Sequence, residues 1–506
     1  MARGALAVGA ALLALTLMPV VALVGQAGLN LRLSPGDVAA IRFTVIQASL
    51  SALLSVAFAV PVARALARRR FPGRGLMIAA LGAPFILPVI VAVMGLLAVF
   101  GRAGWLNAAL ATLGLPLVSI YGLHGVVLAH VFFNLPLAVR LILMGGQVIP
   151  AERFRLARSL GFTPRDTFRH LEVPMLRTVL PGATLLIFTL CLTSFAVALT
   201  LGGGPRATTV ELAIYQALRF DFDLAAAARL ALVQFALCTA TFLVATRLTL
   251  PPMFGTGLDR TGGPEGPQGW RRTADAALLL TAALFIALPL AAIALKGLPG
   301  LTSLPPEILP ATLRSLTVAL AATALTITAA LTLSLAAARG ARLPALAATL
   351  PLAASSLVLG TGLFLLLRPF AAPPTLALPV TIAVNTALAL PFAFRALAPE
   401  AKALTSHDRL AASLGLTGIA RLRWITLPRL ARPLGFAAGL TAALAMGDLG
   451  VIALFAGEGQ ATLPLVIQRL MGAYRTEAAA SAALLLVTLS FALFALFDGI
   501  GRRAAP

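Results

Sequence analysis

The chain has 506 residues, of which 60% are hydrophobic and only 11% are charged, and its formal net charge is +22. A soluble globular domain carries about a quarter charged residues, so this composition excludes one and indicates a polytopic membrane protein. The positive charge does not indicate nucleic-acid binding, because arginine-rich and nearly uncharged short loops alternate along the chain, as the positive-inside rule produces.

Apolar segments that are long enough to cross a bilayer recur along the whole chain. About 20 apolar residues span a hydrocarbon core of about 30 Å, and without water to satisfy the backbone they must be helical. The first six predicted spans are 5–27, 41–67, 76–100, 121–147, 179–203 and 225–249. The next six are 274–296, 311–338, 344–367, 375–397, 432–456 and 477–500. The sequence therefore predicts an all-α polytopic membrane protein with about twelve transmembrane helices.

A polar segment, "PPMFGTGLDRTGGPEGPQGWRR" at residues 251–272, separates the two sets of spans. Its glycine and proline content indicates a flexible linker that cannot be a membrane helix. The sequence thus predicts a first half, residues 1–250, and a second half, residues 273–506, each with about six spans. Placing the arginine-rich loops inside puts the linker and both termini in the cytoplasm.

An arginine-rich motif occurs once in each half, at a constant offset of 254 residues. The copies are "RLARSLGFTPRDTFRHLEVPML" at 155–176 and "RLAASLGLTGIARLRWITLPRL" at 409–430, which agree at ten of 22 positions. Gly161 and Gly415 are predicted to end a first short helix, because glycine adopts the positive φ that a helix end often needs. The repetition makes an ordinary charged loop a poor explanation of the motif.

A proline closes each copy of the motif. Pro174 and Pro428 are predicted to end a second amphipathic helix, because proline cannot continue a hydrogen-bonded turn. Each copy is thus expected to form a helix–turn–helix unit, here called a bracket, that protrudes into the cytoplasm. Two brackets of the same build indicate docking to a two-fold symmetric cytoplasmic partner.

The bracket resembles the EAA loop of binding-protein-dependent ABC importer permeases, whose pattern is a Glu-Ala-Ala run, then a glycine, then Ile-x-Leu-Pro. The matching positions are Leu156, Ala157, Gly161 and Pro174 in the first copy, and Leu410, Ala411, Gly415 and Pro428 in the second. The resemblance implies a type I importer permease in which residues 152–176 and 404–430 are coupling loops for a cytoplasmic ATPase subunit, expected as a dimer. Arg155 and Arg409 stand where the family has glutamate.

Three further segments resemble the fused permeases of the thiamine and thiamine pyrophosphate importers: "RRRFPGR", "YGLHGVVLAHVFFNLP" and "LGGGPRATTVELAIYQAL". This resemblance implies a subunit in the bacterial inner membrane, surrounded by membrane lipid, that moves cargo from a periplasmic substrate-binding protein to the cytoplasm. Fused permeases of iron(III) importers share the twelve-span plan and are the close alternative. An ion-coupled secondary transporter is the alternative of a different class, but it does not require paired brackets.

The chain carries no nucleotide-binding or enzymatic motif. A Walker A loop needs a Gly-Lys pair, and the only lysines, Lys296 and Lys402, follow leucine and alanine. ATP is therefore expected to be bound by a separate subunit, with no cofactor on this chain. The four histidines form no HExxH motif or other metal-like cluster, so neither a catalytic nor a metal site is predicted.

A few polar residues fall within the predicted spans and are candidates for a substrate pathway. Asp448 is an acid in the eleventh span, and charges there are costly and usually face a cavity. Ser194 occupies the matching position of the first half, and Asn134 and Asn385 lie in the fourth and tenth spans. A structural carboxylate at Asp448 and interhelical hydrogen bonds from the two asparagines are the alternatives.

Overall fold

The structure is a computed structural model that describes residues 2–28, 32–204, 207–245, 247–248, 269–457 and 459–505. Over these residues the chain is helical and contains no strand, which confirms the predicted all-α membrane fold. Among the described residues, eleven helices are long and apolar enough to cross a membrane, or twelve if one bent pair counts as a span. Most of the predicted linker, residues 251–268, lies outside the described residues, so the boundary between the halves stays a prediction.

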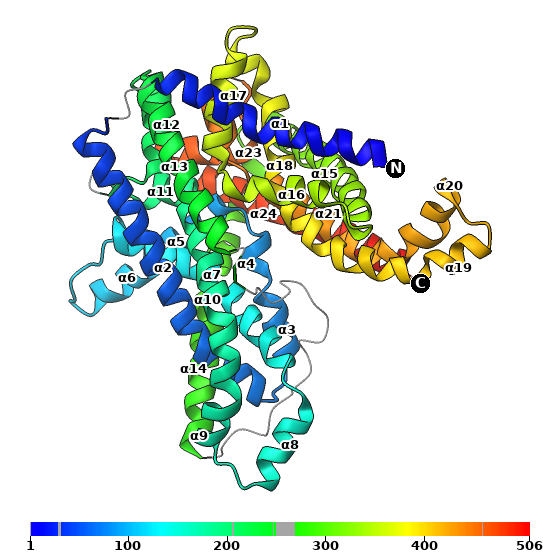
Figure 1. The fold of residues 1–506 in the computed structure, drawn as a ribbon. Coiled ribbons are helices and arrows are strands. Elements are labelled where there is room, and N and C mark those ends of the chain that lie inside the picture. Colours follow the sequence, from blue (N-terminus) through cyan, green and yellow to red (C-terminus); the bar gives the residue numbers. More distant parts are fainter. Residues whose placement is uncertain are drawn as a thin grey trace.

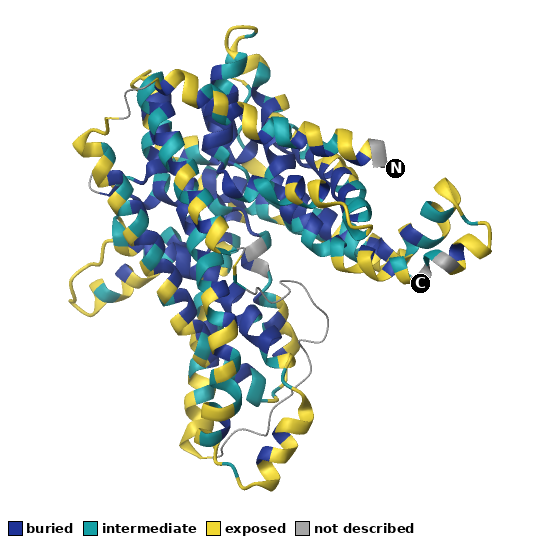
Figure 2. Cartoon of the chain, in the orientation of Figure 1, coloured by how far each residue is buried: buried dark blue, intermediate teal, exposed yellow. Residues whose placement is uncertain are grey.

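The long helices run in two arms that diverge from a common region (Figure 1). The first half contributes α1 (Ala2–Ala27), α2 (Pro35–Arg68), α7 (Leu123–Gln147), α10 (Val173–Leu192) and α13 (Leu224–Ala245). The second half contributes α14 (Trp270–Gly297), α15 (Ile308–Ala338), α18 (Pro373–Ala403), α21 (Leu427–Met446) and α24 (Thr476–Ala504). Helices α2, α7 and α10 pack together in the first arm, and α15, α18 and α21 pack together in the second. Buried residues concentrate where the arms join, whereas the arm ends are largely exposed (Figure 2).

The predictions of single helices over 76–100 and 344–367 are wrong. The first segment is divided into α3 (Arg74–Ala80), α4 (Ala83–Ile86) and α5 (Val89–Phe100). The second is divided into α16 (Arg342–Thr349), the 3₁₀ turn η4 (Leu350–Ala353) and α17 (Ser356–Leu367), with a bend of 98°. Pro88 and Pro351 lie in these breaks, where the missing N–H and the proline ring prevent a continuous helix.

Two short amphipathic helices, α12 (Val210–Arg219) and α23 (Leu463–Gly472), are tied to the long helices in the same way. The hydroxyl of Thr44 in α2 accepts a hydrogen bond from the first N–H of α12, over 2.8 Å. The hydroxyl of Ser315 in α15 accepts one from the first N–H of α23, also over 2.8 Å. The shared tie satisfies an N–H group that a helix start leaves without an internal partner.

The first helix of each half packs on the other half. Helix α1 lies against α15, α16 and α17, and α14 lies against α2 and α5. In each contact a glycine packs directly against the carbonyl group of a proline. A Cβ added at Gly362 would come within 2.5 Å of the Pro19 carbonyl oxygen. A Cβ added at Gly95 would come within 2.6 Å of the Pro289 oxygen. The halves are therefore joined by two equivalent seats that only glycine fits.

An ion-pair cluster fixes α14 to the first arm. The Asp275 carboxylate accepts hydrogen bonds from Arg68 over 3.1 Å and from Arg69 over 2.8 Å. All three side chains are largely shielded from solvent, so salt screens this pairing less than it would screen an exposed one. Helix α14 is thus fixed to the first half by ion pairs near its start and by close packing further along.

We expect Gly95→Ala and Gly362→Ala each to lower the thermal stability of the purified protein. The added methyl group has no space beside the proline carbonyl, and overpacking of this kind costs about 1–3 kcal/mol. The measurement is the melting temperature in detergent, with Gly25→Ala of α1 as the matched control, because no described atom lies within 4 Å of a Cβ added there. Equal melting temperatures for all three variants would show that the seats tolerate a side chain.

Candidate functional site

A bracket stands at the end of each arm (Figure 1). The first bracket consists of α8 (Ala151–Ser159), α9 (Pro164–Thr167) and the π-helical turn η1 (Phe168–Glu172). The second consists of α19 (Asp408–Ser413), α20 (Gly418–Arg421) and the π-helical turn η6 (Leu422–Thr426). The first bracket lies between α7 and α10 and the second lies between α18 and α21, so they project in the same manner from equivalent positions.

The first helix of each bracket ends at the glycine that the sequence singles out. Gly161 and Gly415 have φ values of 70° and 71°. The N–H after each glycine bonds back to an alanine carbonyl, Ala157 or Ala411, over 2.9 Å, which is the Schellman arrangement. No atom of the described residues lies within 4 Å of a Cβ added at either glycine. Backbone conformation, rather than lack of space, therefore requires glycine at these two turns.

The prediction that Pro174 and Pro428 end a helix is wrong. The π-helical turn of each bracket continues directly into the next long helix, α10 or α21. The N–H groups of Val173 and Leu427 bond five residues back, to the carbonyls of Phe168 and Leu422. The wider turn shifts the hydrogen-bond register just before each proline. The proline then occupies the first turn of the long helix, where its missing N–H leaves nothing unsatisfied.

The first bracket is fixed to its arm through the π-helical turn. The Arg64 guanidinium of α2 donates to Glu172 over 2.5 Å and lies 3.9 Å from the centre of the Phe168 ring. Charge-assisted hydrogen bonds and cation–π contacts of this kind are among the stronger polar interactions at a partly buried site. The first bracket is therefore attached to α2 as well as to α10.

Different side chains close the turns of the two brackets. In the first, Thr163 and Asp166 form a reciprocal capping box at the start of α9, with hydrogen bonds of 3.0 and 3.3 Å to each other's backbone N–H. In the second, Thr417 makes no such cap, and Arg421 instead pairs with Asp408. The two brackets thus keep the same backbone course with unrelated local stabilisation.

Each bracket presents a pair of exposed leucines, here called the tip leucines. Leu156 and Leu160 in the first bracket are 58% and 64% exposed, and Leu410 and Leu414 in the second are 60% and 65% exposed. The adjacent Ala157 and Ala411 are buried instead. Sequence reasoning selected the first leucine of each pair and missed the second. The i,i+4 spacing, repeated in both copies, is the signal that identifies the second leucine as part of the same surface.

Arg155, which replaces the family's glutamate, is itself paired with an acid. Its guanidinium donates to the Glu152 carboxylate over 2.7 Å, and both side chains are exposed. The pKa of Glu152 lies below its usual value because the carboxylate accepts hydrogen bonds from its own backbone N–H and from Arg155. A carboxylate therefore remains on the first bracket, one turn before the position where the family carries it.

Asp448 lies in a break between α21 and α22 (Gly450–Phe455), with Asn385 of α18 beside it. One carboxylate oxygen accepts a hydrogen bond from the Gly450 N–H over 3.3 Å, and the other is buried without a hydrogen-bond partner in the described part of the chain. A Cβ added at Gly447 would come within 3.0 Å of Pro88, so the break also touches the first half. Asp448 is thus a half-buried acid, with one fully buried carboxylate oxygen, close to the junction of the halves.

The matching region of the first half is organised around Asn134. Its amide donates to the His130 carbonyl over 2.8 Å and to the Cys191 sulfur of α10 over 3.4 Å. Ser194 follows in the break after α10, at the start of α11 (Phe195–Leu201). The structure therefore pairs Asn385 with Asp448, and it uses Asn134 to connect α7 to α10. A position for Ser194 opposite Asp448 stays a prediction.

Sequence reasoning missed a fully buried acid near the junction of the halves. Glu211 in α12 is fully buried, and the side chains of Gln234 in α13 and Ser355 at the start of α17 lie next to it. Its carboxylate thus sits where a helix of the first half meets one of the second. The signal was available, because Glu211 is an isolated acid in the apolar stretch "TTVELAIYQAL".

Comparison with known proteins identifies the family. No protein-family model matches the chain. Proteins named thiamine transport system permease protein are 42% identical in Brucella abortus (strain 2308), over 90% of this chain and 86% of theirs. Those of Escherichia coli (strain K12) and Haemophilus influenzae (strain ATCC 51907 / DSM 11121 / KW20 / Rd) are 41% and 34% identical, over 92% and 90% of this chain and 89% and 87% of theirs. The chain therefore belongs to the family of thiamine transport system permease proteins.

Proposed function

We propose that this multi-pass membrane protein is the transmembrane subunit of an ATP-driven importer for thiamine or thiamine pyrophosphate. The observation that carries the proposal is the pair of equivalent brackets, one at the end of each arm. Family membership supports the cargo, because the relatives are named for thiamine transport. The chain is a transport protein rather than an enzyme, and the energy for transport comes from ATP hydrolysed by another subunit.

The tip leucines are the proposed contact with that ATPase. Each pair places two leucines, 58–65% exposed, on a short helix that ends in a rigid glycine turn. Apolar side chains that insert into a pocket of a partner supply much of the binding energy in protein interfaces. Two equivalent tips fit two equivalent grooves, so the partner is a dimeric cytoplasmic ATPase. A periplasmic substrate-binding protein delivers cargo to the opposite side.

The brackets also set the orientation in the membrane. With both tips in the cytoplasm, the end of α24 and the start of α1 lie on the cytoplasmic side of the inner membrane. Arg502 and Arg503 near the chain end agree with the positive-inside rule. The breaks that hold Asp448 and Ser194 then lie along the route between the two membrane faces, and Asp448 is the proposed contact for a cationic cargo.

Reconstitution tests the proposal directly. The chain is placed in liposomes with its co-purified ATPase and binding protein, and uptake of labelled thiamine and thiamine pyrophosphate is measured with ATP supplied on the ATPase side. We expect uptake that requires both partners, continues with a protonophore, and stops with an ATPase variant that binds but does not hydrolyse ATP.

Two outcomes would contradict the proposal in different ways. Uptake without the ATPase that a protonophore abolishes would identify a secondary transporter. ATP-dependent uptake of ferric iron, with none of either thiamine compound, would keep the importer and overturn its cargo. Matched liposomes that lack this chain provide the background in each case.

A further inference from the structure

The two arms differ in how the last helix of each half packs. In the second half, α24 follows α21 closely, because glycines allow the backbones to approach. A Cβ added at Gly501 would come within 2.6 Å of the Ala431 carbonyl oxygen and 2.7 Å of the Gly435 Cα atom. Ala431 and Gly435 thus form a smooth surface on α21 that the end of α24 covers.

The first half carries larger residues at the matching positions. At the constant offset of 254, Arg177 and Pro181 of α10 replace Ala431 and Gly435. The long arginine side chain and the proline ring prevent the close helix contact that alanine and glycine permit. The matching helix α13 ends at Ala245, and within the described part of the chain Arg177 and Pro181 of α10 stay exposed.

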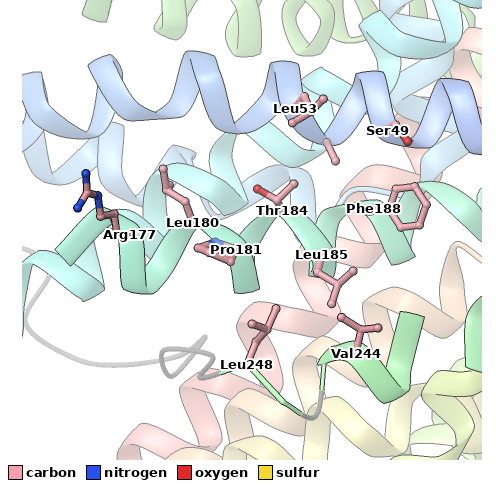
Figure 3. Close-up of a pocket in the computed structure, with 11 residues that line it drawn as sticks. Ser49, Leu53, Arg177, Leu180, Pro181, Thr184, Leu185, Phe188, Val244 and Leu248 are labelled. Atoms are coloured by element: carbon pink, nitrogen blue, oxygen red, sulfur yellow. The ribbon is translucent and has the colours of Figure 1, made fainter. Parts of the chain in front are cut away.

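A groove occupies the surface of α10 that α13 leaves open, between α2 and the end of α13 (Figure 3). It has a volume of about 700 Å³, and its lining is almost entirely apolar. Leu53 of α2, Leu180, Leu185 and Phe188 of α10 and Val244 of α13 provide most of this surface. Because the helices that line it cross the membrane, the groove opens toward acyl chains rather than toward water.

Arg177 gives the groove a direction. It lies at the bracket end of α10, and Phe188 lies about three helical turns deeper, at the other end of the groove (Figure 3). The Arg177 side chain is exposed, and it joins none of the ion pairs that the described residues form. An apolar trough with a positive charge at its cytoplasmic end complements a lipid with an anionic headgroup.

We propose that this groove binds one anionic phospholipid of the cytoplasmic leaflet, with an acyl chain along α10 and the phosphate at Arg177. The orientation rests on the proposed function, which places the brackets in the cytoplasm. The lipid fills the surface that α24 covers in the second arm, so it seals the first arm where the described residues do not. Only the first half carries this site, because the glycine contact closes the equivalent surface of the second half.

Fluorescence quenching tests the site without any transport assay. Phe188→Trp is made in the full chain with Trp105, Trp270 and Trp424 changed to phenylalanine. The protein is placed in nanodiscs that contain a small fraction of phosphatidylglycerol or phosphatidylcholine, each brominated on its acyl chains. We expect quenching by phosphatidylglycerol at about fivefold lower lipid fraction, as one basic residue near an anionic lipid provides. Adding Arg177→Gln should remove that preference.

Phe58→Trp is the matched control, because Phe58 is an exposed residue of α2 outside the groove. Both brominated lipids should quench it equally. Equal quenching of the Phe188→Trp protein by the two lipids, or a preference that survives Arg177→Gln, would overturn the headgroup assignment. Quenching of the Phe188→Trp protein by neither lipid would show that protein covers the groove and would overturn the site. A transport failure with intact lipid preference would instead count against the proposed function alone.

Discussion

Replacing both tip leucines of either bracket by aspartate is expected to abolish ATP-driven uptake while the transmembrane fold stays intact. Leu156 and Leu160, or Leu410 and Leu414, are the only residues changed. Their side chains are exposed in the isolated chain, so the substitution costs little folding free energy. Each substitution of a leucine that is buried in an ATPase groove would cost about 2 kcal/mol or more of binding free energy. Two such losses together would release the ATPase. Uptake in liposomes and co-purification of the ATPase measure the effect.

Conservative variants separate a docking role from a folding role. Methionine at the same four positions keeps the apolar surface, so uptake and ATPase association should stay close to those of the unchanged protein. The melting temperature should be the same for the aspartate and methionine variants. Normal uptake with aspartate in both brackets would refute docking through the tip leucines. A lower melting temperature for the aspartate variants would instead show that these residues stabilise the chain itself.

Asp448→Asn is expected to reduce thiamine uptake by about tenfold or more and to reduce thiamine pyrophosphate uptake less. Thiamine carries a fixed cationic ring, whereas its pyrophosphate ester is net anionic. Opposite charges in a site of low dielectric constant interact by several kcal/mol at contact, so the Asp448 carboxylate favours the cation. Asparagine keeps the shape and the hydrogen bond to Gly450 and removes only the charge. Initial uptake rates at equal protein level provide the comparison.

Glu211→Gln is the control for this variant, because it too removes a carboxylate near the junction of the halves, in this case a fully buried one. It should change uptake of the two cargoes in equal proportion. An equal loss of both cargoes with Asp448→Asn, at normal abundance, would exclude a charge-selective contact. A fall in the amount of Asp448→Asn protein would show that the carboxylate stabilises the helix break.

Patterns that are local in the sequence predicted the corresponding features of the structure. Hydrophobic length predicted the membrane helices, because the cost of burying backbone polar groups in lipid leaves few other solutions. The repeated motif predicted the brackets, and the positive φ of Gly161 and Gly415 follows from the need to end a helix within a few residues. These properties depend on a residue and its near neighbours.

Features that depend on contacts between distant segments could not be predicted in this way. Hydropathy cannot distinguish a straight span from the segment around Pro88, where the helix breaks and α14 and α21 pack beside it. Pro174 does not end its helix, because the π-helical turn before it shifts the hydrogen-bond register. The groove beside Arg177 becomes evident only when its position on α10 is compared with that of Ala431 on α21.

The first helix of each half packs on the other half, and this arrangement determines which segments can be exchanged between related permeases. Joining residues 1–250 of one permease to the second half of a relative would place α1 of one parent on α17 of the other. The pairs Pro19 with Gly362 and Pro289 with Gly95 would then each combine residues of different ancestry. If the chimera is joined after α1, the contact between Pro19 and Gly362 stays within one parent only when α1 and α17 are both taken from that parent. The unit of inheritance in such a chimera is thus a helix together with its distant seat, rather than a contiguous half.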